Sequence, residues 1–491
     1  MKTNVPRVKT GVSGLDDILN GGLIANRLYL INGDPGSGKT TLALHYLREG
    51  VRLGERCLYV TLSETREELI AGAVSHGWDL SGIEIVELNT SEQDLSPDGQ
   101  ITLYPSSEVE LTETTNAVVE AVKRADPQRV VVDSLSEFRL LAQNSLRYRR
   151  QILALKQFFI GRNSTVLLLD DGTSEDADLQ LQSIAHGVVS LEHLVPVYGA
   201  ERRRVRMTKF RSSRFRGGFH DFTIVEGGLR VFPRLVASEH AEAFERTPVP
   251  SGVQALDDLL GGGPDRGTST LLMGPAGCGK STVSVQYAVA AALRGEKAVI
   301  FAFDESTGTL EARSKGIGLP ITEVMRSGKL VVRQVDPAEL SPGEFVHLVR
   351  EAVEVEDARL IVIDSLNGYL NAMPEERYLT AQLHELLTYL GRRGVTTILV
   401  VAQHGLLGSQ ILSPVDASYL SDSVVLFRYF EYAGEVRKAI SVMKKRSGRH
   451  EGYIRELEMD QTGLRFSEAL TDFHGILTGV PVETPQASRR P

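Results

Sequence analysis

The chain has 491 residues, which is too long for one ordinary hydrophobic core and predicts two or three domains. Hydrophobic residues make up 42% and charged residues 24%, as in an ordinary globular protein. The net charge of −9 disfavours unspecific binding of the whole surface to DNA or acidic membranes.

Two further features predict where the protein resides. The two cysteines, Cys57 and Cys278, offer neither a disulfide framework nor a metal-ligand spacing, which fits a reducing compartment. The first residues lack an apolar signal segment, and no run of about 18 apolar residues follows. We therefore expect a cytoplasmic protein that does not span a membrane.

The chain contains an internal duplication. The segment GVSGLDDILNGG at position 11 recurs as GVQALDDLLGGG at position 252, an offset of 241. Further on, RVVVDS and RLIVIDS align at an offset of 231, so the intervening part of the first half is ten residues longer. Charged and proline-containing sequence at 237–250 predicts the boundary, with domains at 1–240 and 241–480 and a flexible tail at 481–491.

Apolar runs alternate with helical segments in each half. In the first half the runs cover residues 27–33, 57–63, 129–134 and 164–171, with a helix predicted over 41–54. In the second half they cover 268–274, 298–305, 359–365 and 396–404. Such runs are typical of parallel strands that are buried on both faces. The sequence therefore predicts two α/β domains in tandem.

A glycine-rich phosphate loop occurs in both halves. GDPGSGKT at 33–40 and GPAGCGKS at 274–281 match G-x-x-x-x-G-K-[ST] between a predicted strand and a predicted helix. Glycines let successive backbone N–H groups converge on phosphates, and the helix N-terminus adds the positive end of its dipole. A chance glycine turn before a lysine is the alternative, but two occurrences in matching context favour two ATP sites. The predicted ATP-binding residues are Gly33, Gly36, Ser37, Gly38, Lys39, Thr40, Thr41, Gly274, Gly277, Cys278, Gly279, Lys280, Ser281 and Thr282.

Each loop also predicts a magnesium site. Lys39 and Lys280 are expected to reach the β and γ phosphates, while the hydroxyl groups of Thr40 and Ser281 ligate Mg²⁺. Asp133 and Asp364 end apolar strands at equivalent places, where a carboxylate can hold the metal through water. The alternative for these acids is a turn or helix cap.

Carboxylates that follow the second predicted strand are candidates for the group that orients or deprotonates the attacking oxygen. Glu64 and Glu305 occupy equivalent positions, and the second half adds Asp304 where the first has Ser63. The alternative is that these are ordinary acids of surface loops. The difference at Asp304 predicts a functional difference between the halves.

Cys278 lies inside the second phosphate loop and allows two interpretations. A helix N-terminus lowers the pKa of a nearby thiol, so a redox switch is conceivable. The interpretation favoured by the sequence is a small residue that fills a position in the loop.

Together these residues resemble the KaiC family of double-domain RecA-like ATPases, from Gly11 to about Val480. The resemblance is carried by the G-x-x-x-L-D-D-[IL]-L-x-G-G segment, both phosphate loops and the acids after the strands. It implies two tandem RecA-like P-loop domains and a homohexameric ring with ATP bound between adjacent subunits. It also implies that Glu64 and the pair Asp304 and Glu305 activate water or a hydroxyl group.

The resemblance extends to two lysine–x–arginine segments, MTKFRSS at 207–213 and VMKKRSG at 442–448. In the family this segment reaches the nucleotide of a neighbouring subunit, which implies that role for Lys209, Arg211, Lys444 and Arg446. The first pair lies in a basic cluster at 202–216. That cluster fits a nucleic-acid surface or a solvated strand face, and both alternatives stay open.

The second domain of clock kinases of this family phosphorylates itself on adjacent serine and threonine residues. Aligning SDSVVLFRYFE places Ser418 at the serine, whereas Tyr419 replaces the threonine. A two-site Ser/Thr cycle therefore cannot run unchanged, and a single-site cycle on Ser418 is implied, with Tyr419, Ser413 or Ser421 as further acceptors.

The resulting hypothesis is an ATP-hydrolysing timing or signalling protein that binds ATP and Mg²⁺ and has serine autokinase activity in its second domain. Clock or signalling proteins are its expected partners, and neither nucleic acid nor a membrane is expected. The alternatives are a RecA-like DNA-binding ATPase, supported by the basic cluster, and a scaffold that uses ATP only for assembly.

Overall fold

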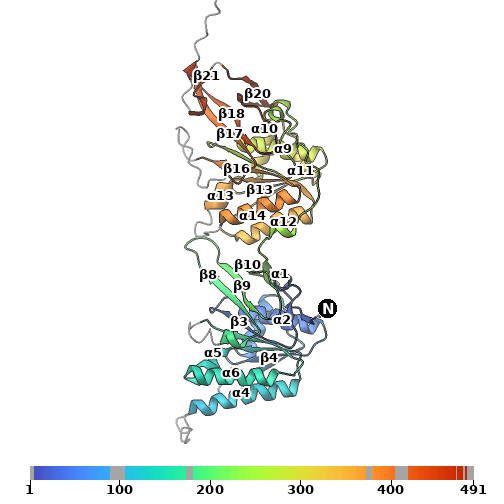
Figure 1. Cartoon of the computed structure of the whole chain (residues 1–491), viewed down its shortest axis with the longest axis vertical. Helices are drawn as coiled ribbons and strands as arrows, with labels where there is room; N and C mark the ends of the chain where they lie inside the picture. The colour runs from blue at the N-terminus through green and yellow to red at the C-terminus, as the bar shows by residue number, and fades with distance from the viewer. Residues whose placement is uncertain are drawn as a thin grey trace, which may run out of the picture. The chain divides into compact units, whose positions relative to one another are not determined.

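The computed structural model describes residues 5–88, 106–172, 181–371, 379–403, 418–471, 473–478 and 482–483. The chain divides into two compact units, residues 1–234 and 235–491 (Figure 1). Most of the predicted tail at 481–491, and the candidate acceptor Ser413, lie outside the described residues. Within the described part of the chain, every helix is too short or too polar to cross a membrane.

The first unit is built on a nine-stranded sheet with the order β11-β10-β9-β8-β3-β7-β6-β4-β5. The strands from β8 to β5 in this order run parallel, and β9, β10 and β11 extend the sheet in antiparallel fashion. The strands are β3 Leu28–Gly33, β4 Cys57–Thr61, β5 Ile83–Glu87, β6 Arg129–Asp133, β7 Thr165–Asp170, β8 Gly187–Leu194, β9 Arg202–Phe210, β10 His220–Val225 and β11 Gly228–Phe232. A separate pair consists of β1 Arg7–Val8 and β2 Leu23–Ile24.

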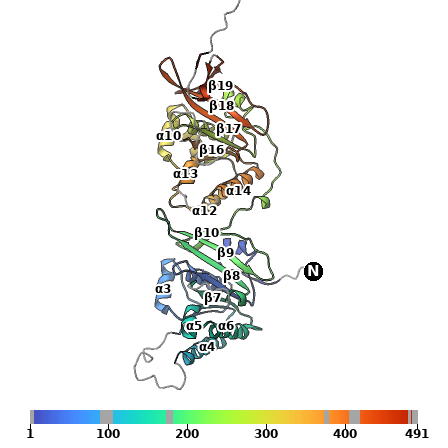
Figure 2. The ribbon, with the colours of Figure 1, turned by 60° about the vertical axis from the view of Figure 1, so that its left-hand side comes forward.

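Helices cover both faces of this sheet because the parallel strands are apolar on both sides. In β3, Tyr29 and Ile31 pack into a core with α2, whereas Leu28 and Leu30 pack into a second core with α4, α5 and α6. Figures 1 and 2 show these last three helices together on one face. The helices are α1 Ser13–Ile18, α2 Lys39–Arg52, α3 Arg66–Ser75, α4 Ser106–Ala125, α5 Leu135–Ala142 and α6 Ser145–Phe159.

The second unit repeats this architecture with the strand order β14-β13-β15-β16-β12-β17-β18-β19-β20. Its strands from β14 to β17 are parallel, and β18, β19 and β20 follow in antiparallel fashion. The strands are β12 Ser269–Gly274, β13 Lys297–Ala302, β14 Leu330–Gln334, β15 Ala358–Asp364, β16 Thr396–Ala402, β17 Ser423–Tyr432, β18 Glu435–Lys445, β19 Ile454–Asp460 and β20 Gly463–Ala469. A small pair follows, formed by β21 Phe473–His474 and β22 Val482–Glu483.

Two helical layers again enclose the sheet. One core contains α12, α13 and α14, and the opposite core contains α8, α9, α10 and α11. The helices are α8 Gln254–Leu259, α9 Lys280–Leu293, α10 Thr307–Gly316, α11 Ile321–Arg326, α12 Pro342–Glu354, α13 Leu366–Asn371 and α14 Leu379–Arg392. The predicted fold class, two tandem α/β domains with mostly parallel sheets flanked by helices, is confirmed.

The strand order explains where the functional residues gather. In each unit the chain leaves the central strand, β3 or β12, and builds the parallel strands on one side before it returns to the other side. Because these strands are parallel, the loops that follow them emerge at one edge of the sheet, where open α/β sheets bind their ligands.

Candidate nucleotide sites

The first phosphate loop joins β3 to α2. Gly36 and Gly38 have φ angles of 78° and 98°, in the left-handed region that glycine adopts without strain. A Cβ on Gly38 would also lie 2.8 Å from Ile224 Cδ1, so a larger residue does not fit without rearrangement. The loop therefore needs its glycines for the backbone path that exposes successive N–H groups.

Lys39 is buried at the base of this loop. Its ammonium group donates to the carbonyl oxygens of Gly33 at 2.7 Å and Asp34 at 3.0 Å, and it forms an ion pair with Asp171 at 2.8 Å. The Ser136 hydroxyl also donates to Asp171, at 2.7 Å. Although burial opposes it, contact with Lys39 and Ser136 holds the pKa of Asp171 below its ordinary value.

Asp171 was not among the predicted site residues. The signal in the sequence was the second acid of STVLLLDD, directly after the apolar run at 164–171. The corresponding position of the second half, 231 residues further on, is Ala402. The two lysines therefore have different surroundings, which the phosphate-loop motif alone does not reveal.

The second phosphate loop joins β12 to α9 and holds its lysine through a backbone carbonyl oxygen. Lys280 donates to the carbonyl oxygen of Pro275 at 2.5 Å and lies 3.7 Å from the sulfur of Cys278. Among the described residues, no carboxylate forms an ion pair with Lys280. Cys278 is fully buried, and burial raises the pKa of its thiol. A protonated, enclosed thiol suits a packing residue better than a redox switch.

A hydroxyl and a carboxylate meet at each predicted magnesium position. In the first half, Thr40 Oγ1 donates to Asp133 Oδ2 at 3.2 Å, and the Tyr59 hydroxyl donates to the same oxygen at 2.5 Å. Burial raises the pKa of Asp133, and the hydrogen bonds from Tyr59 and Thr40 oppose that rise. Oxygen donors of this kind suit Mg²⁺. Tyr59 is a neighbour that the sequence analysis did not identify.

The second half places Ser281 against Asp364 in the same way. Burial raises the pKa of Asp364 to about 6, while the Ser281 hydroxyl and Arg313 lower it and the charges of Glu305 and Asp304 raise it. This carboxylate is therefore costly to ionise unless a cation lies beside it. The donor set fits a divalent cation bound between the phosphate loop and the end of β15.

We expect Asp364→Asn to raise the melting temperature of the second unit at pH 8 without ATP or Mg²⁺, because it removes a buried charge. The raised pKa of about 6, against an ordinary 3.8, means that the wild-type carboxyl group becomes protonated in the fold as the pH falls below 6. The advantage of the variant should then shrink and vanish near pH 4.

Calorimetric melting curves between pH 4 and 8 measure this difference. Glu431→Gln, which removes an exposed carboxylate on β17, is the matched control and should show no such trend. A stabilisation of Asp364→Asn that grows toward low pH would contradict the assignment.

The candidate catalytic acids lie just after β4 and β13. In the first half, the backbone N–H of Glu64 donates to Thr61 Oγ1 at 3.1 Å, and that hydroxyl donates to the Glu64 carbonyl at 2.6 Å. This small ring fixes the main chain where the strand ends. Burial, with smaller contributions from Asp133 and Glu68, raises the pKa of Glu64. A raised pKa makes a carboxylate a better base near neutral pH.

The two acids of the second half have different partners. Asp304 accepts a short hydrogen bond from the Ser365 hydroxyl, next to Asp364. Glu305 forms a two-point ion pair with Arg313, with Nε–Oε1 at 3.1 Å and Nη2–Oε2 at 2.9 Å. Arg313 was not identified from the sequence, because it lies in the following helix, α10. Asp304 is thus bound by a hydroxyl group, whereas Glu305 is held by a guanidinium.

The lysine–x–arginine segments occupy equivalent places in β9 and at the end of β18. Lys209 and Arg211 donate to the Ser183 carbonyl, at 3.2 and 2.9 Å. In the second half, Lys444 donates to the carbonyl oxygens of Ser418 and Ser421, at 2.9 and 2.7 Å, and Arg446 to that of Tyr419, at 2.8 Å. Both pairs therefore hold the segment that precedes the neighbouring strand.

The hydrogen bonds from Lys444 and Arg446 hold the backbone at the candidate phosphoacceptor Ser418 and at Tyr419. Ser418 is partly exposed and Tyr419 is 54% exposed, whereas Ser421 is fully buried. Ser421 is thus a poor acceptor in the folded chain. Contact of the Lys209 and Lys444 pairs with a neighbouring subunit stays a prediction.

The basic cluster at 202–216 is partly neutralised within the first unit. Arg203 pairs with Glu201 at 2.6 Å and Arg204 with Glu192 at 3.3 Å. Arg204 and Arg206 also lie over the ring of Phe219, 4.9 and 4.7 Å from its centroid. These contacts favour a packed strand face over an open surface for a nucleic-acid backbone.

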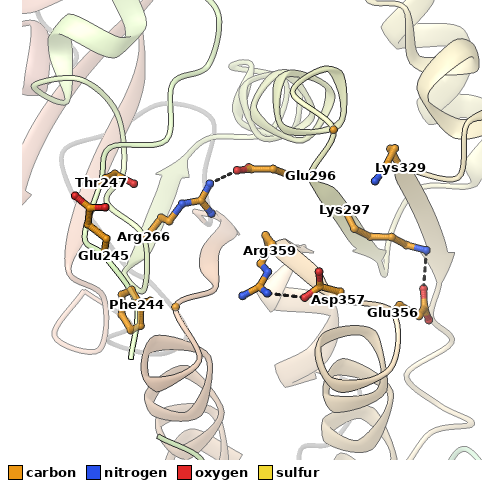
Figure 3. Close-up of a pocket in the computed structure, with 12 residues that line it drawn as sticks. Phe244, Glu245, Thr247, Arg266, Glu296, Lys297, Lys329, Glu356, Asp357 and Arg359 are labelled. Carbon is orange, nitrogen blue, oxygen red and sulfur yellow. Dashed lines mark hydrogen bonds and ion pairs between the residues drawn. The ribbon is translucent and has the colours of Figure 1, made fainter. Parts of the chain in front are cut away.

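A charged cavity of about 590 Å³ lies in the second unit, outside the predicted sites (Figure 3). Arg266, Lys297 and Arg359 line it from the beginning of β12, β13 and β15, at the edge of the sheet opposite the phosphate loop. Acids pair with them, as in Lys297–Glu356 at 3.1 Å. The balanced charges give this cavity no evident preference for a charged ligand.

The repeated sheet, phosphate loop and strand-end acids define a tandem P-loop ATPase. The KaiC ATPase family matches the chain over residues 8–236 and again over residues 249–470. The chain belongs to the KaiC family, and the predicted resemblance is confirmed; it is an ATP-binding, ATP-hydrolysing enzyme with duplicated domains.

Several relatives with KaiC names match over nearly the full chain. The circadian clock oscillator protein KaiC of Parathermosynechococcus lividus is 26% identical over 485 residues, which cover 97% of this chain and 88% of that protein. The oscillator protein KaiC of Acaryochloris marina is 25% identical, covering 100% of this chain and 94% of its own length. The circadian clock protein KaiC3 of Synechocystis sp. is 26% identical, with coverage of 98% and 96%.

Proposed function

We propose that the first half is a slow ATPase in which Glu64 positions the attacking water. Lys39 would bind the β and γ phosphates, and Thr40 with Asp133 would hold Mg²⁺, which offsets negative charge on the phosphates when bound. The raised pKa of Glu64 and its place beside Asp133 support the role of base. The observation that carries this proposal is the convergence of phosphate loop, hydroxyl, buried aspartate and glutamate at one sheet edge.

In the second half, we propose that ATP serves both hydrolysis and phosphorylation of Ser418. Lys280 and Ser281 would bind ATP and Mg²⁺ with Asp364, and Asp304 or Glu305 would accept the proton of the attacking oxygen. Positioning contributes most of the catalysis in phosphoryl transfer, so alignment decides whether water or a serine hydroxyl reacts. The partial exposure of Ser418 and its bonded backbone support it as the acceptor.

We further propose a homohexamer with ATP between subunits, where Lys209, Arg211, Lys444 and Arg446 face the nucleotide of a neighbour. The names of the relatives support a role in biological timing or signalling, with other clock or signalling proteins as partners. With two rings of sites, slow hydrolysis in the first half would set the timing, and phosphorylation of Ser418 in the second half would be the reversible modification. This division of roles would explain why the phosphate loop occurs twice.

Incubation of the purified chain with ATP and Mg²⁺ tests this function. We expect ADP release over hours and phosphate on Ser418, detected by peptide mass spectrometry. Ser418→Ala should lose that phosphate and keep hydrolysis in the first half, and Ser421→Ala is the control. Phosphate found only on other residues would contradict the kinase proposal.

Two other results would replace the proposed function. DNA-stimulated turnover with steep salt dependence would support a DNA-binding ATPase. A stable ATP-loaded assembly without turnover would support a scaffold.

A further inference from the structure

The two halves differ at two positions beside the candidate base. At the repeat offset of 241, Ser63 corresponds to Asp304, and Gly72 corresponds to Arg313. The glutamate between them, Glu64 or Glu305, is the same in both halves. The second half therefore has one more carboxylate and one more guanidinium at these positions, and the three positions carry one net negative charge in either half.

Arg313 joins two elements of the second site. Two of its nitrogens bind the two carboxylate oxygens of Glu305, and the third, Nη1, donates to Thr282 Oγ1 at 2.8 Å. Thr282 lies in the first turn of α9, directly after the magnesium candidate Ser281. The side chains of Arg313 and Glu305 are 28% and 26% exposed, so water screens the pair only in part.

The surroundings explain why a cation is needed there. Asp304 and Glu305 are adjacent, and Asp304 accepts a hydrogen bond from Ser365, the residue after Asp364, so three carboxylates lie at one strand edge while Arg313 binds Glu305. ATP would bring further negative charge to the same edge of the sheet. An unpaired Glu305 in this cluster would repel the triphosphate, whereas an Arg313-bound Glu305 does so much less.

We propose that Arg313 is a positioning residue of the second half. It neutralises Glu305 and holds its carboxylate in place, so that Asp304 can lie near the triphosphate without lowering the affinity for ATP. The inference rests on the proposed binding of ATP at the second phosphate loop. On this proposal the differences Ser63/Asp304 and Gly72/Arg313 are coupled, because the carboxylate of Asp304 requires the guanidinium of Arg313.

The test measures ATP affinity of the full chain in a Lys39→Ala background, in which only the second half binds. Arg313→Ala should weaken binding about tenfold, as expected for one added charge roughly 10 Å from another at an effective dielectric of about 20. Arg313→Lys should recover most of this loss. Arg313→Ala with Asp304→Ser should also recover it, because that variant restores the charge arrangement of the first half.

The first half allows the reciprocal experiment in a Lys280→Ala background. Ser63→Asp should weaken ATP binding, and addition of Gly72→Arg should restore it. Gly72 is a suitable site because a Cβ there would meet no atom within 4 Å, and Thr41 and Glu64 stand where Thr282 and Glu305 stand in the second half.

The outcomes separate the inference from the function on which it rests. If the Lys39→Ala chain binds no ATP, both are overturned for the second half. If it binds ATP and Arg313→Ala binds equally well, the role of Arg313 alone is overturned. The same holds if Asp304→Ser fails to rescue Arg313→Ala, because a residue that only joins α10 to α9 would not respond to the charge at position 304.

Discussion

Lys39→Ala and Lys280→Ala should each weaken ATP binding strongly enough to empty the half that carries the substitution at micromolar ATP, and leave the other half loaded. Both lysines are buried at the base of a phosphate loop, where an ammonium group meets phosphate with little competition from water. Loss of charge-assisted bonds of this kind costs about 3 kcal/mol, or roughly a hundredfold in affinity. Nucleotide content per chain should fall from two to one in each single variant and to zero in the double variant.

The two lysine variants should differ in stability. Lys39→Ala leaves Asp171 without its ammonium partner, whereas Lys280→Ala removes a hydrogen bond to the Pro275 carbonyl, which still accepts from the Cys278 thiol at 2.9 Å. Without nucleotide, we therefore expect a larger loss of melting temperature for Lys39→Ala. Lys123→Ala, which removes a surface ion pair with Glu120, is the control for both measurements. Intact ATP affinity in the double variant would refute both sites.

Glu64→Gln should stop hydrolysis in the first half without loss of ATP binding. Glutamine keeps the size of the side chain and removes its ability to accept a proton, and loss of a general base costs about 10²- to 10⁴-fold in rate. Turnover measured in the Lys280→Ala background isolates the first half.

Glu67→Gln provides the matched control, because Glu67 lies three residues away in α3 and is exposed. It should turn over as the parent does. If Glu64→Gln does as well, another group positions the water, and Ser63 with Asp171 would be the next residues to test.

Much of this protein could be predicted from local patterns. The duplication, the apolar runs of the central strands and the two phosphate loops are each recognisable from short stretches of contiguous sequence. The antiparallel strands β9 to β11 and β18 to β20 were not predicted. They are half-exposed and polar, as in RRRVRMTKF of β9, so they lack the continuous apolar signal of the parallel strands.

The contacts of the site residues could not be predicted in this way, because they depend on which strands and helices lie next to each other in the fold. Asp171 reaches Lys39 because β7 lies next to β3, although more than a hundred residues separate them in the chain. Tyr59 reaches Asp133 because β4 and β6 are neighbours. Arg313, in α10, reaches back to Glu305, which directly precedes that helix and its N-cap, and the spacing of these residues matches no motif.

The sequence by itself determined the class of chemistry, because a phosphate loop works through its own backbone and needs only adjacent residues. Only the tertiary structure decided which charges meet at the two sites: within the described ranges of the chain, Lys39 is paired to an acid and Lys280 is not, and Glu305 but not Glu64 is bound by a guanidinium. The reason is physical: charges act through space, and folding rather than sequence distance sets which charges meet.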